Sequence, residues 1–479
     1  MDDLRAFPRL VIAGMSGSSG KTIVSLGLLH LLRRAGLEVR AFKKGPDYID
    51  AAWLTWASSD TARNLDTYLM GPQRVFESFT YHAVPDGINL IEGNRGIFDG
   101  FDAAGTHSTA ALARLLSAPV ILVVNASKVT RTAAAFVLGC QKLDPAVEIR
   151  GVVLNHVNGE RHREVLRNAI ESACSIPVVG TIPNAKASLL PERHLGLVTP
   201  QEHSTRKKLG QDLLRLVDGR LDLDALLAIA HSAPPLPRVS EERLAGPVAA
   251  EVNIGYLKDA AFTFYYPENL EQLERAGARL IPISALTATA LSANLQALYI
   301  GGGFPETHAR ELSGNRSFLR SLREAASCGL PIYAECGGLI VLAKNLLWKD
   351  GRYPMAGVFP FDVEVCGSPQ GHGYSELRVD RPHPFFPVGL ALRGHEFHYS
   401  RILPCKETVA TTCVVHRGAG CLDKREFVTS RNVVATYTHL HALASPEWAT
   451  GIVNAGRRFA VQGAGRGSRE TGASLAERW

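Results

Sequence analysis

The run GMSGSSGKT, residues 14–22, stands between a short apolar segment, Leu10 to Ala13, and a segment with apolar residues at helical spacing, Thr22 to Ala35. This order predicts a strand, a tight glycine-rich loop and a helix. Backbone N–H groups in such a loop, together with the positive end of the helix dipole, hold phosphate oxygens. The stretch therefore predicts a phosphate-binding P-loop at the start of an α/β domain.

Within this loop, Lys21 is placed to reach the β and γ phosphates of ATP, and the Thr22 hydroxyl to coordinate Mg²⁺. The spacing is a variant, because the strict GxxxxGK[ST] pattern needs a glycine where Met15 stands, whereas Gly14 lies one residue earlier. We predict that the ATP phosphates contact Gly17, Ser18, Ser19, Gly20, Lys21 and Thr22.

Carboxylates that follow two further apolar strands are candidates for the rest of the metal site. Asp47 and Asp50 lie in FKKGPDYID, residues 42–50, and Glu92 and Asp99 lie in IEGNRGIFDG, residues 91–100. The carboxyl ends of strands line the ligand crevice of a doubly wound sheet, so acids at these points are placed to hold Mg²⁺. The predicted metal-binding residues are Thr22, Asp47, Glu92 and Asp99, with Asp50 as a further candidate.

Apolar runs alternate with helical segments along the whole chain, which predicts two α/β domains. In the first half the runs are 88–91, 120–124, 152–154 and 178–180; in the second they are 252–256, 279–283, 297–300 and 331–334. The proline- and charge-rich stretch SAPPLPRVSEERLAGP separates the two halves. We predict an ATP-dependent domain over 1–232, a linker over 233–250, a second domain over 251–455 and a mobile tail over 456–479.

Composition excludes several classes of protein. The 479 residues are 46% hydrophobic and 20% charged, which is typical of a globular α/β enzyme. The eight cysteines form no CxxC pair, so no disulfide framework or zinc site is predicted, and no export signal or membrane span is evident. We expect a cytoplasmic protein without a membrane partner. The formal charge of +6 is spread over helices, which disfavours nucleic acid and suits anionic small molecules.

A second chemical site is predicted around Cys336. The segment PIYAECGGL, residues 331–339, reads as a strand, a sharp turn and a helix, which would expose the thiol at a helix N-terminus and lower its pKa. A nucleophilic cysteine needs a base that is close in space. We predict His439 in ATYTHLH, with His395 and His398 in RGHEFHY as competitors.

A tetrahedral oxyanion at this site would need donors. The segment GGGFPE, residues 301–306, follows an apolar strand, and we predict that its backbone N–H groups at Gly302 and Gly303 supply them.

Taken together, these motifs resemble the cobyrinate a,c-diamide synthase family and its relatives that act on hydrogenobyrinate and other tetrapyrroles. The resemblance covers about residues 8–455. It rests on GMSGSSGKT, FKKGPDYID, RNLD (63–66), EGNRGIFDG (92–100), LPERHLGLV (190–198), GGGFPE, YAECGGL (333–339), RGHEFHYS (393–400) and YTHLH (437–441). It implies a P-loop, dethiobiotin-synthetase-like, doubly wound ATP domain followed by a class I glutamine amidotransferase domain.

The resemblance also implies the chemistry. Cys336 would attack glutamine to form a glutamyl thioester, His439 would move the protons, and ammonia would pass internally to the other domain. There ATP and Mg²⁺ would convert a carboxylate of an anionic tetrapyrrole into an acyl phosphate, which ammonia displaces. By the same analogy Asn155, in GVVLNHVN, occupies an adenine-reading position.

Three departures from the family pattern concern the triad and the acceptor. Many class I amidotransferases carry a glutamate two residues after the histidine, where this chain has His441, so a complete Cys-His-Glu triad is not predicted. Asn94 and Arg95 replace more usual residues, and Asn125 stands where aspartate is common. We predict that Arg95 and Tyr48 contact an acceptor carboxylate.

The acceptor alternatives are cobyrinate, hydrogenobyrinate, sirohydrochlorin and siroheme. A regulatory P-loop ATPase is a more distant alternative, because it would not need Cys336, His439 or GGGFPE.

Overall fold

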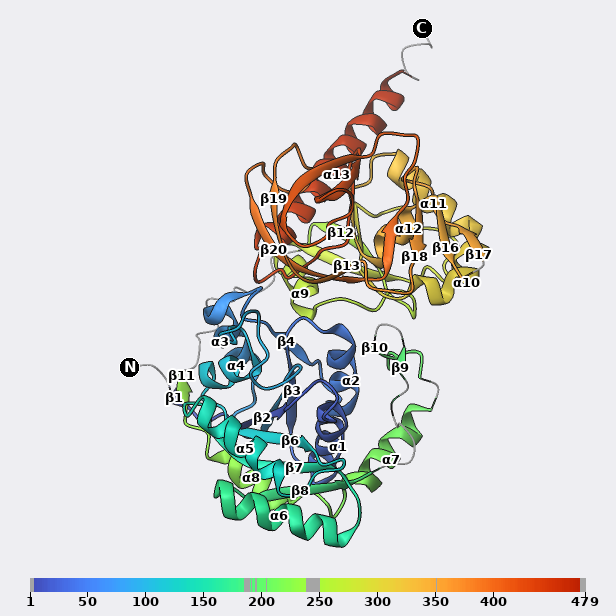
Figure 1. Ribbon diagram of the computed structural model, residues 1–479. Helices are drawn as coiled ribbons and strands as arrows, with labels where there is room; N and C mark the ends of the chain where they lie inside the picture. The colour runs from blue at the N-terminus through green and yellow to red at the C-terminus, as the bar shows by residue number, and fades with distance from the viewer. Residues whose placement is uncertain are drawn as a thin grey trace. The chain divides into compact units, whose positions relative to one another are not determined.

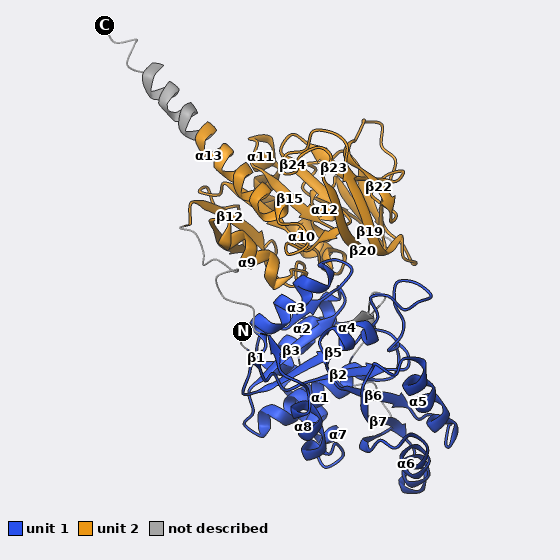
Figure 2. Cartoon of the chain, turned by 90° about the vertical axis from the view of Figure 1, so that its left-hand side faces the viewer, with its two compact units in different colours: residues 1–244 blue, residues 245–479 orange. Residues whose placement is uncertain are grey.

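The computed structural model describes residues 4–184, 190, 192–193, 196–203, 205–237, 250–349 and 351–473. The chain divides into two compact units, residues 1–244 and 245–479 (Figure 2). Most of the predicted linker, 233–250, lies outside the described residues, so the predicted domain boundaries stay predictions.

Unit 1 is built on a parallel sheet with the strand order β4-β3-β5-β2-β6-β7-β8, seven strands among the residues described (Figure 1). The central strand β2 is buried at every position, as expected for a parallel sheet covered on both faces. The strands are β2 (Arg9–Gly14), β3 (Val39–Lys44), β4 (Arg63–Leu65), β5 (Ile88–Glu92), β6 (Val120–Asn125), β7 (Ile149–Val157) and β8 (Val178–Pro183).

Eight helices of the described part connect or follow these strands. They are α1 (Lys21–Arg34), α2 (Tyr48–Ser58), α3 (Gly71–His82), α4 (Thr109–Leu115), α5 (Thr132–Leu143), α6 (Glu160–Cys174), α7 (Arg206–Val217) and α8 (Leu223–His231). Helix α1 packs against α2 and α7, and Phe42 of β3 packs against Phe79 of α3, with ring centroids 5.0 Å apart. Two short antiparallel pairs are β1 (Leu4–Arg5) with β11 (Leu236–Pro237), and β9 (Glu192–Arg193) with β10 (Gly196–Leu197).

This topology brings three of the predicted loops to one edge of the sheet. Strand β5 pairs with β2 on one side and β3 on the other. The P-loop, FKKGPDYID and EGNRGIFDG follow the carboxyl ends of these neighbouring strands. The doubly wound fold predicted for the first half is confirmed, and the residues predicted to bind ATP follow the carboxyl ends of its central strands.

Unit 2 contains a mixed sheet of ten strands within the described ranges, in the order β13-β12-β14-β15-β24-β23-β22-β19-β20-β25. Strands β12 to β15 and β24 pair in parallel, and the others pair antiparallel. They are β12 (Val252–Leu257), β13 (Ala278–Ile283), β14 (Ala297–Ile300), β15 (Ile332–Glu335), β19 (Gly371–Val379), β20 (Ala391–His398), β22 (Ala410–Arg417), β23 (Arg425–Ser430), β24 (Val433–Thr436) and β25 (His439–Leu440). The four strands predicted here are confirmed, and the structure adds that they pair in parallel; the antiparallel half was not predicted.

The rest of unit 2 completes two apolar cores, one on each face of this sheet's strands. A smaller sheet has the order β17-β16-β18-β21, from β16 (Asn345–Trp348), β17 (Gly351–Pro354), β18 (Asp362–Val365) and β21 (Ser400–Ile402). The helices are α9 (Pro267–Arg275), the 3-10 turn η2 (Pro305–His308), α10 (Ala309–Gly314), α11 (Arg316–Ser327), α12 (Gly337–Leu342) and α13 (Glu447–Ala473). Helix α13 extends into 456–479, where mobility stays a prediction.

Among the residues described, no helix is both long enough and apolar enough to span a membrane. The eight cysteines are free thiols.

Candidate functional sites

The P-loop backbone is held in place by Asn155. The Asn155 Nδ2 donates to the carbonyl of Ser19 at 3.0 Å, from the end of β7. Gly20 has a φ of 95°, and a β-carbon there would collide with Asn155 Nδ2, so both the backbone and the packing require glycine. The adenine-reading role predicted for Asn155 stays a prediction, whereas its contact with the loop is a finding.

Lys21 lies along this loop and is almost fully buried. Its Nζ donates to the Ser16 carbonyl at 2.9 Å. Burial, reinforced by the nearby charge of Lys43, lowers the pKa of Lys21 to about 8. A lysine held this way is ready to exchange a backbone carbonyl for phosphate oxygens.

Lys43 is a central residue of this site that sequence reasoning missed. Its buried ammonium lies 2.5 Å from Asp50 Oδ2 and 2.9 Å from Glu92 Oε1. Burial opposes the charge, but these carboxylates outweigh it and raise the pKa of Lys43. The signal in the sequence was a lysine directly after the apolar residues Ala41 and Phe42 of a strand, where an unpaired charge is too costly to bury.

The predicted metal-binding residues meet only in part. The Thr22 hydroxyl donates to Glu92 Oε1 at 2.9 Å, and Glu92 Oε2 is buried without a hydrogen-bond partner in the described structure. Asp47 caps α2 by accepting from the amides of Ile49 and Asp50, each at 2.9 Å.

Asp99 belongs to the neighbouring loop, where its Oδ2 accepts from the Gly96 amide at 2.8 Å. Its charge nevertheless acts on Lys21. No cluster of three or more His, Cys, Asp or Glu suited to a metal occurs among the described residues. Mg²⁺ needs only one or two carboxylates beside substrate phosphates, so Thr22 and Glu92 fit this ion.

The two residues predicted to contact the acceptor belong to the same group of loops. Tyr48 is the first residue of α2, directly after the Asp47 cap. Arg95 is exposed, has a φ of 48° and acts electrostatically on Lys44. Their contact with an acceptor stays a prediction.

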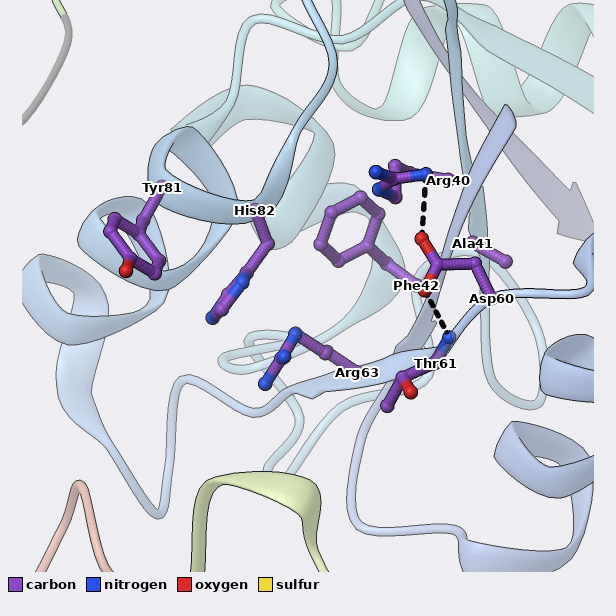
Figure 3. A pocket seen from close by; sticks show the side chains of 8 residues that line it. All are labelled: Arg40, Ala41, Phe42, Asp60, Thr61, Arg63, Tyr81 and His82. Carbon is purple, nitrogen blue, oxygen red and sulfur yellow. Dashed lines mark hydrogen bonds and ion pairs between the residues drawn. The ribbon is translucent and has the colours of Figure 1, made fainter. Parts of the chain in front are cut away.

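A separate cavity of about 370 Å³ lies on the face of β3 that carries Phe42 (Figure 3). Figure 3 shows Arg63 of β4 and His82 of α3 turned toward each other, while Arg40 Nη1 lies 2.6 Å from Asp60 Oδ2. Because side chains alternate along a strand, Lys43 points to the opposite face. The lining residues are Arg40, Ala41, Phe42, Asp60, Thr61, Arg63, Tyr81 and His82.

In unit 2, Cys336 stands at the predicted turn between strand and helix. It follows β15 directly, precedes α12, and has a φ of 48° and ψ of −95°, a strained conformation for a residue other than glycine. Its amide donates to the Thr436 carbonyl at 2.7 Å, which ties the turn to β24. The strand, turn and helix predicted from PIYAECGGL are confirmed.

The pKa that the sequence suggested for this thiol is wrong. Cys336 is only 8% exposed, and burial, with the Glu306 carboxylate as the next contribution, raises its pKa to about 12. The single short turn of helix that follows does not compensate for this loss of solvation. The raised pKa favours the neutral thiol at physiological pH.

The glycine loop, the cysteine turn and His439 come together. A β-carbon on Gly302 would lie 2.7 Å from Cε1 of His439, and one on Gly337 would lie 3.1 Å from the amide nitrogen of Gly303. The Gly301 amide is already bonded to the Tyr265 hydroxyl at 2.9 Å. The three segments predicted to form the nucleophilic site thus lie side by side, although their catalytic roles stay predictions.

The two alternative candidates for the base, His395 and His398, contact other groups. His395 stacks on His439 with ring centroids 5.1 Å apart, and its Nδ1 lies 3.3 Å from the Tyr266 hydroxyl. His398 stacks on Tyr437 at 3.7 Å, and its Nδ1 lies 2.7 Å from the Ser400 carbonyl. These contacts favour His439 as the base.

Two buried glutamates near His439 were also missed by sequence reasoning. Glu426 accepts from the amides of Tyr437 and Thr438 at 3.2 and 3.1 Å and so fixes the turn before His439. Glu335, the residue before Cys336, has its Oε2 3.2 Å from His439 Nδ1. Each is an acid next to buried apolar residues of its strand, as Lys43 is.

The family comparisons agree with this division of the chain. Residues 10–198 match the CobQ/CobB/MinD/ParA nucleotide binding domain, and residues 253–447 match the CobB/CobQ-like glutamine amidotransferase domain. The fold and the two family matches thus define a P-loop nucleotide-binding unit fused to a glutamine amidotransferase, a ligase that takes its amide nitrogen from glutamine.

Several relatives that are similar over nearly the whole chain carry the name cobyrinate a,c-diamide synthase. That of Magnetococcus marinus is 41% identical over 449 residues, 92% of this chain and 96% of the relative. That of Dehalococcoides mccartyi is 40% identical over 459 residues, 95% and 99% of the two chains. That of Salmonella typhimurium is 36% identical over 450 residues, 94% and 98%. The chain belongs to the cobyrinate a,c-diamide synthase family.

Proposed function

We propose that the chain amidates the a and c carboxylates of cobyrinate, a step of cobalamin biosynthesis, with ATP and glutamine as co-substrates. The observation that carries the proposal is the sequence identity of 36–41%, over nine-tenths or more of each chain, to proteins named cobyrinate a,c-diamide synthase. The grouping of Cys336, His439 and Gly302 in unit 2, and of Lys21, Thr22 and Glu92 in unit 1, supports the two half-reactions.

The first half-reaction would release ammonia from glutamine. As Cys336 Sγ attacks the amide carbon, His439 takes the thiol proton, which a neutral thiol with a raised pKa requires. The oxyanion forms next to the amides of Gly302 and Gly303. His439 then returns the proton to the departing nitrogen, ammonia leaves, and water hydrolyses the glutamyl thioester to glutamate.

The second half-reaction would activate the acceptor, because a free carboxylate is a poor electrophile. A carboxylate oxygen attacks the γ-phosphorus of ATP, ADP leaves, and ammonia displaces inorganic phosphate from the acyl phosphate. Lys21 and the P-loop amides would bind the phosphates. Thr22 and Glu92 would hold Mg²⁺, which neutralises phosphate charge when bound.

Ammonia must move between the two half-reactions, because they use residues of different units. Channelled transfer follows as part of the proposal: ammonia released into solution at neutral pH would be protonated and lose its nucleophilicity.

Mass spectrometry of the acceptor tests the proposal. The full chain is incubated with ATP, Mg²⁺ and glutamine, and with cobyrinate, hydrogenobyrinate, sirohydrochlorin or siroheme in parallel. Each amidation replaces OH by NH₂, and the proposal expects two such changes on cobyrinate. Cys336→Ala should lose this activity with glutamine and recover it with ammonia. Amidation of another acceptor alone would reassign the substrate, and no amidation of any acceptor would refute the proposal.

A further inference from the structure

Many class I amidotransferases carry the triad glutamate at the position of His441 in this chain. His441 contacts Tyr266 and Glu268. The His441 ring packs on Tyr266 with centroids 4.6 Å apart, and its Nε2 lies 3.7 Å from Glu268 Oε2. A histidine in this position cannot supply the carboxylate that a catalytic imidazole uses for orientation. The structure provides a carboxylate from a different strand.

Glu335 is the last residue of β15 and is fully buried. Its Oε2 lies 3.2 Å from His439 Nδ1 and accepts from the Tyr299 hydroxyl at 3.2 Å, while its Oε1 accepts from the Leu440 amide at 3.3 Å. Both carboxylate oxygens of Glu335 therefore contact residues of β25. The carboxylate is held rigidly because β15 lies between β14 and β24 in the sheet.

The turn at Cys336 allows adjacent residues to serve one histidine. Along an extended strand, neighbouring side chains point to opposite faces. The backbone leaves the extended conformation at Cys336, where φ is 48° and ψ is −95°. The alternation ends there, so β15 supplies the orienting carboxylate and the turn supplies the nucleophile.

We propose that Glu335 is the positioning residue of the glutaminase site: it accepts a hydrogen bond from Nδ1–H of His439, fixes that tautomer, leaves Nε2 to take the Cys336 proton, and stabilises the imidazolium that results. Catalytic imidazoles oriented by a buried carboxylate act in this way. The triad would be Cys336-His439-Glu335, with the acid beside the nucleophile in sequence. The inference rests on the glutaminase role proposed for Cys336 and His439.

Other titratable groups face this pair and must be considered in any pH profile. His395 of β20 stacks on His439, and Tyr299 of β14 donates to Glu335. On the nucleophile side, Glu306 acts on the Cys336 thiol. Of these groups, Glu335 is the carboxylate within hydrogen-bond distance of His439 Nδ1.

The test measures glutamate release and amide formation by full-length Glu335→Gln, with glutamine or ammonia as nitrogen source. We expect kcat with glutamine to fall about 10²–10⁴-fold with little change in KM, while ammonia-dependent amidation stays at the wild-type rate. The acid limb of the glutamine-dependent profile should move to lower pH, because the imidazolium loses its carboxylate. Glu268→Gln, which neutralises the buried acid beside His441, is the matched control and should leave both activities unchanged.

Tyr299→Phe provides a second measurement if Glu335→Gln fails to fold. Loss of the hydroxyl donor makes the Glu335 carboxylate a stronger partner for the imidazolium, so the acid limb should move to higher pH. Wild-type glutamine-dependent turnover in Glu335→Gln, or an unmoved acid limb in Tyr299→Phe, would overturn the inference. If Cys336→Ala itself kept glutamine-dependent activity, the glutaminase assignment would fail instead.

Discussion

Gly302→Ala is the most direct perturbation of the glutaminase geometry. The new β-carbon would lie 2.7 Å from Cε1 of His439, whereas non-bonded carbon atoms prefer about 3.5–4.0 Å. The Gly302 carbonyl is held by the Phe264 amide at 3.0 Å, and His439 is buried on β25. One of them must move by about 1 Å to relieve the overlap.

The expected magnitude follows from that displacement. A misplacement of about 1 Å at a catalytic group costs about 10²-fold in rate, and overpacking costs about 1–3 kcal/mol of folding free energy. The amide N–H at position 302 is retained, so loss of an oxyanion donor cannot explain the effect. Glutamine-dependent turnover should therefore fall about 100-fold while ammonia-dependent amidation is unchanged.

The assay compares glutamate release with amide formation from ammonium salts, in the full chain and over the same pH range. Gly314→Ala is the matched control, because a β-carbon at this end of α10 meets no atom within 4 Å. Wild-type glutaminase activity in Gly302→Ala would refute the placement of His439 against the glycine loop.

Three further predictions concern single residues of the two sites. Below pH 8 Lys21 is charged, so ATP affinity should not depend on its ionisation; above pH 8 the affinity should fall as pH rises. The pKa of Lys21, about 8 in the free protein, should rise when phosphate binds, so ATP binding should take up a proton above pH 8. Calorimetry in buffers of different ionisation enthalpy measures this uptake, and its absence above pH 8 would contradict the prediction. Lys43→Met should lower the free energy of unfolding by about 3–5 kcal/mol, because the buried carboxylate of Glu92 and the partly exposed carboxylate of Asp50 lose their cation; urea unfolding beside the exposed-site variant Lys142→Met measures it, and equal loss in both variants would refute it. Cys336→Gly should be more stable than Cys336→Ala by about 1 kcal/mol, because glycine adopts a φ of 48° without strain; thermal unfolding decides, and a less stable glycine variant would contradict the strain argument.

Local order along the chain was sufficient to predict the P-loop and the cysteine turn. Each motif is a strand, a turn and a helix within about one or two dozen residues, and such segments follow from apolar periodicity and glycine placement. The strands around β2 and β12 were predicted for the same reason. The antiparallel half of the second sheet was not, because β19, β20 and β22 mix buried and exposed positions and lack the continuous apolar runs that marked the parallel strands.

The partners of the buried charges could not be obtained in this way. Lys43 meets Glu92 across 49 positions of sequence, and Glu335 meets His439 across 104. A charged residue beside the buried apolar residues of a strand indicates that a partner exists, but not which one.

The chemical state of Cys336 likewise depended on its surroundings. A helix N-terminus is visible in the sequence and predicts a lowered pKa, whereas burial and the Glu306 carboxylate, which only the folded chain brings together, raise it. The motifs and their order could thus be predicted from the local spacing of residues, because backbone geometry repeats over a few residues. Pairings, burial and pKa values came from the tertiary structure, because solvation and Coulomb interactions depend on distance in space.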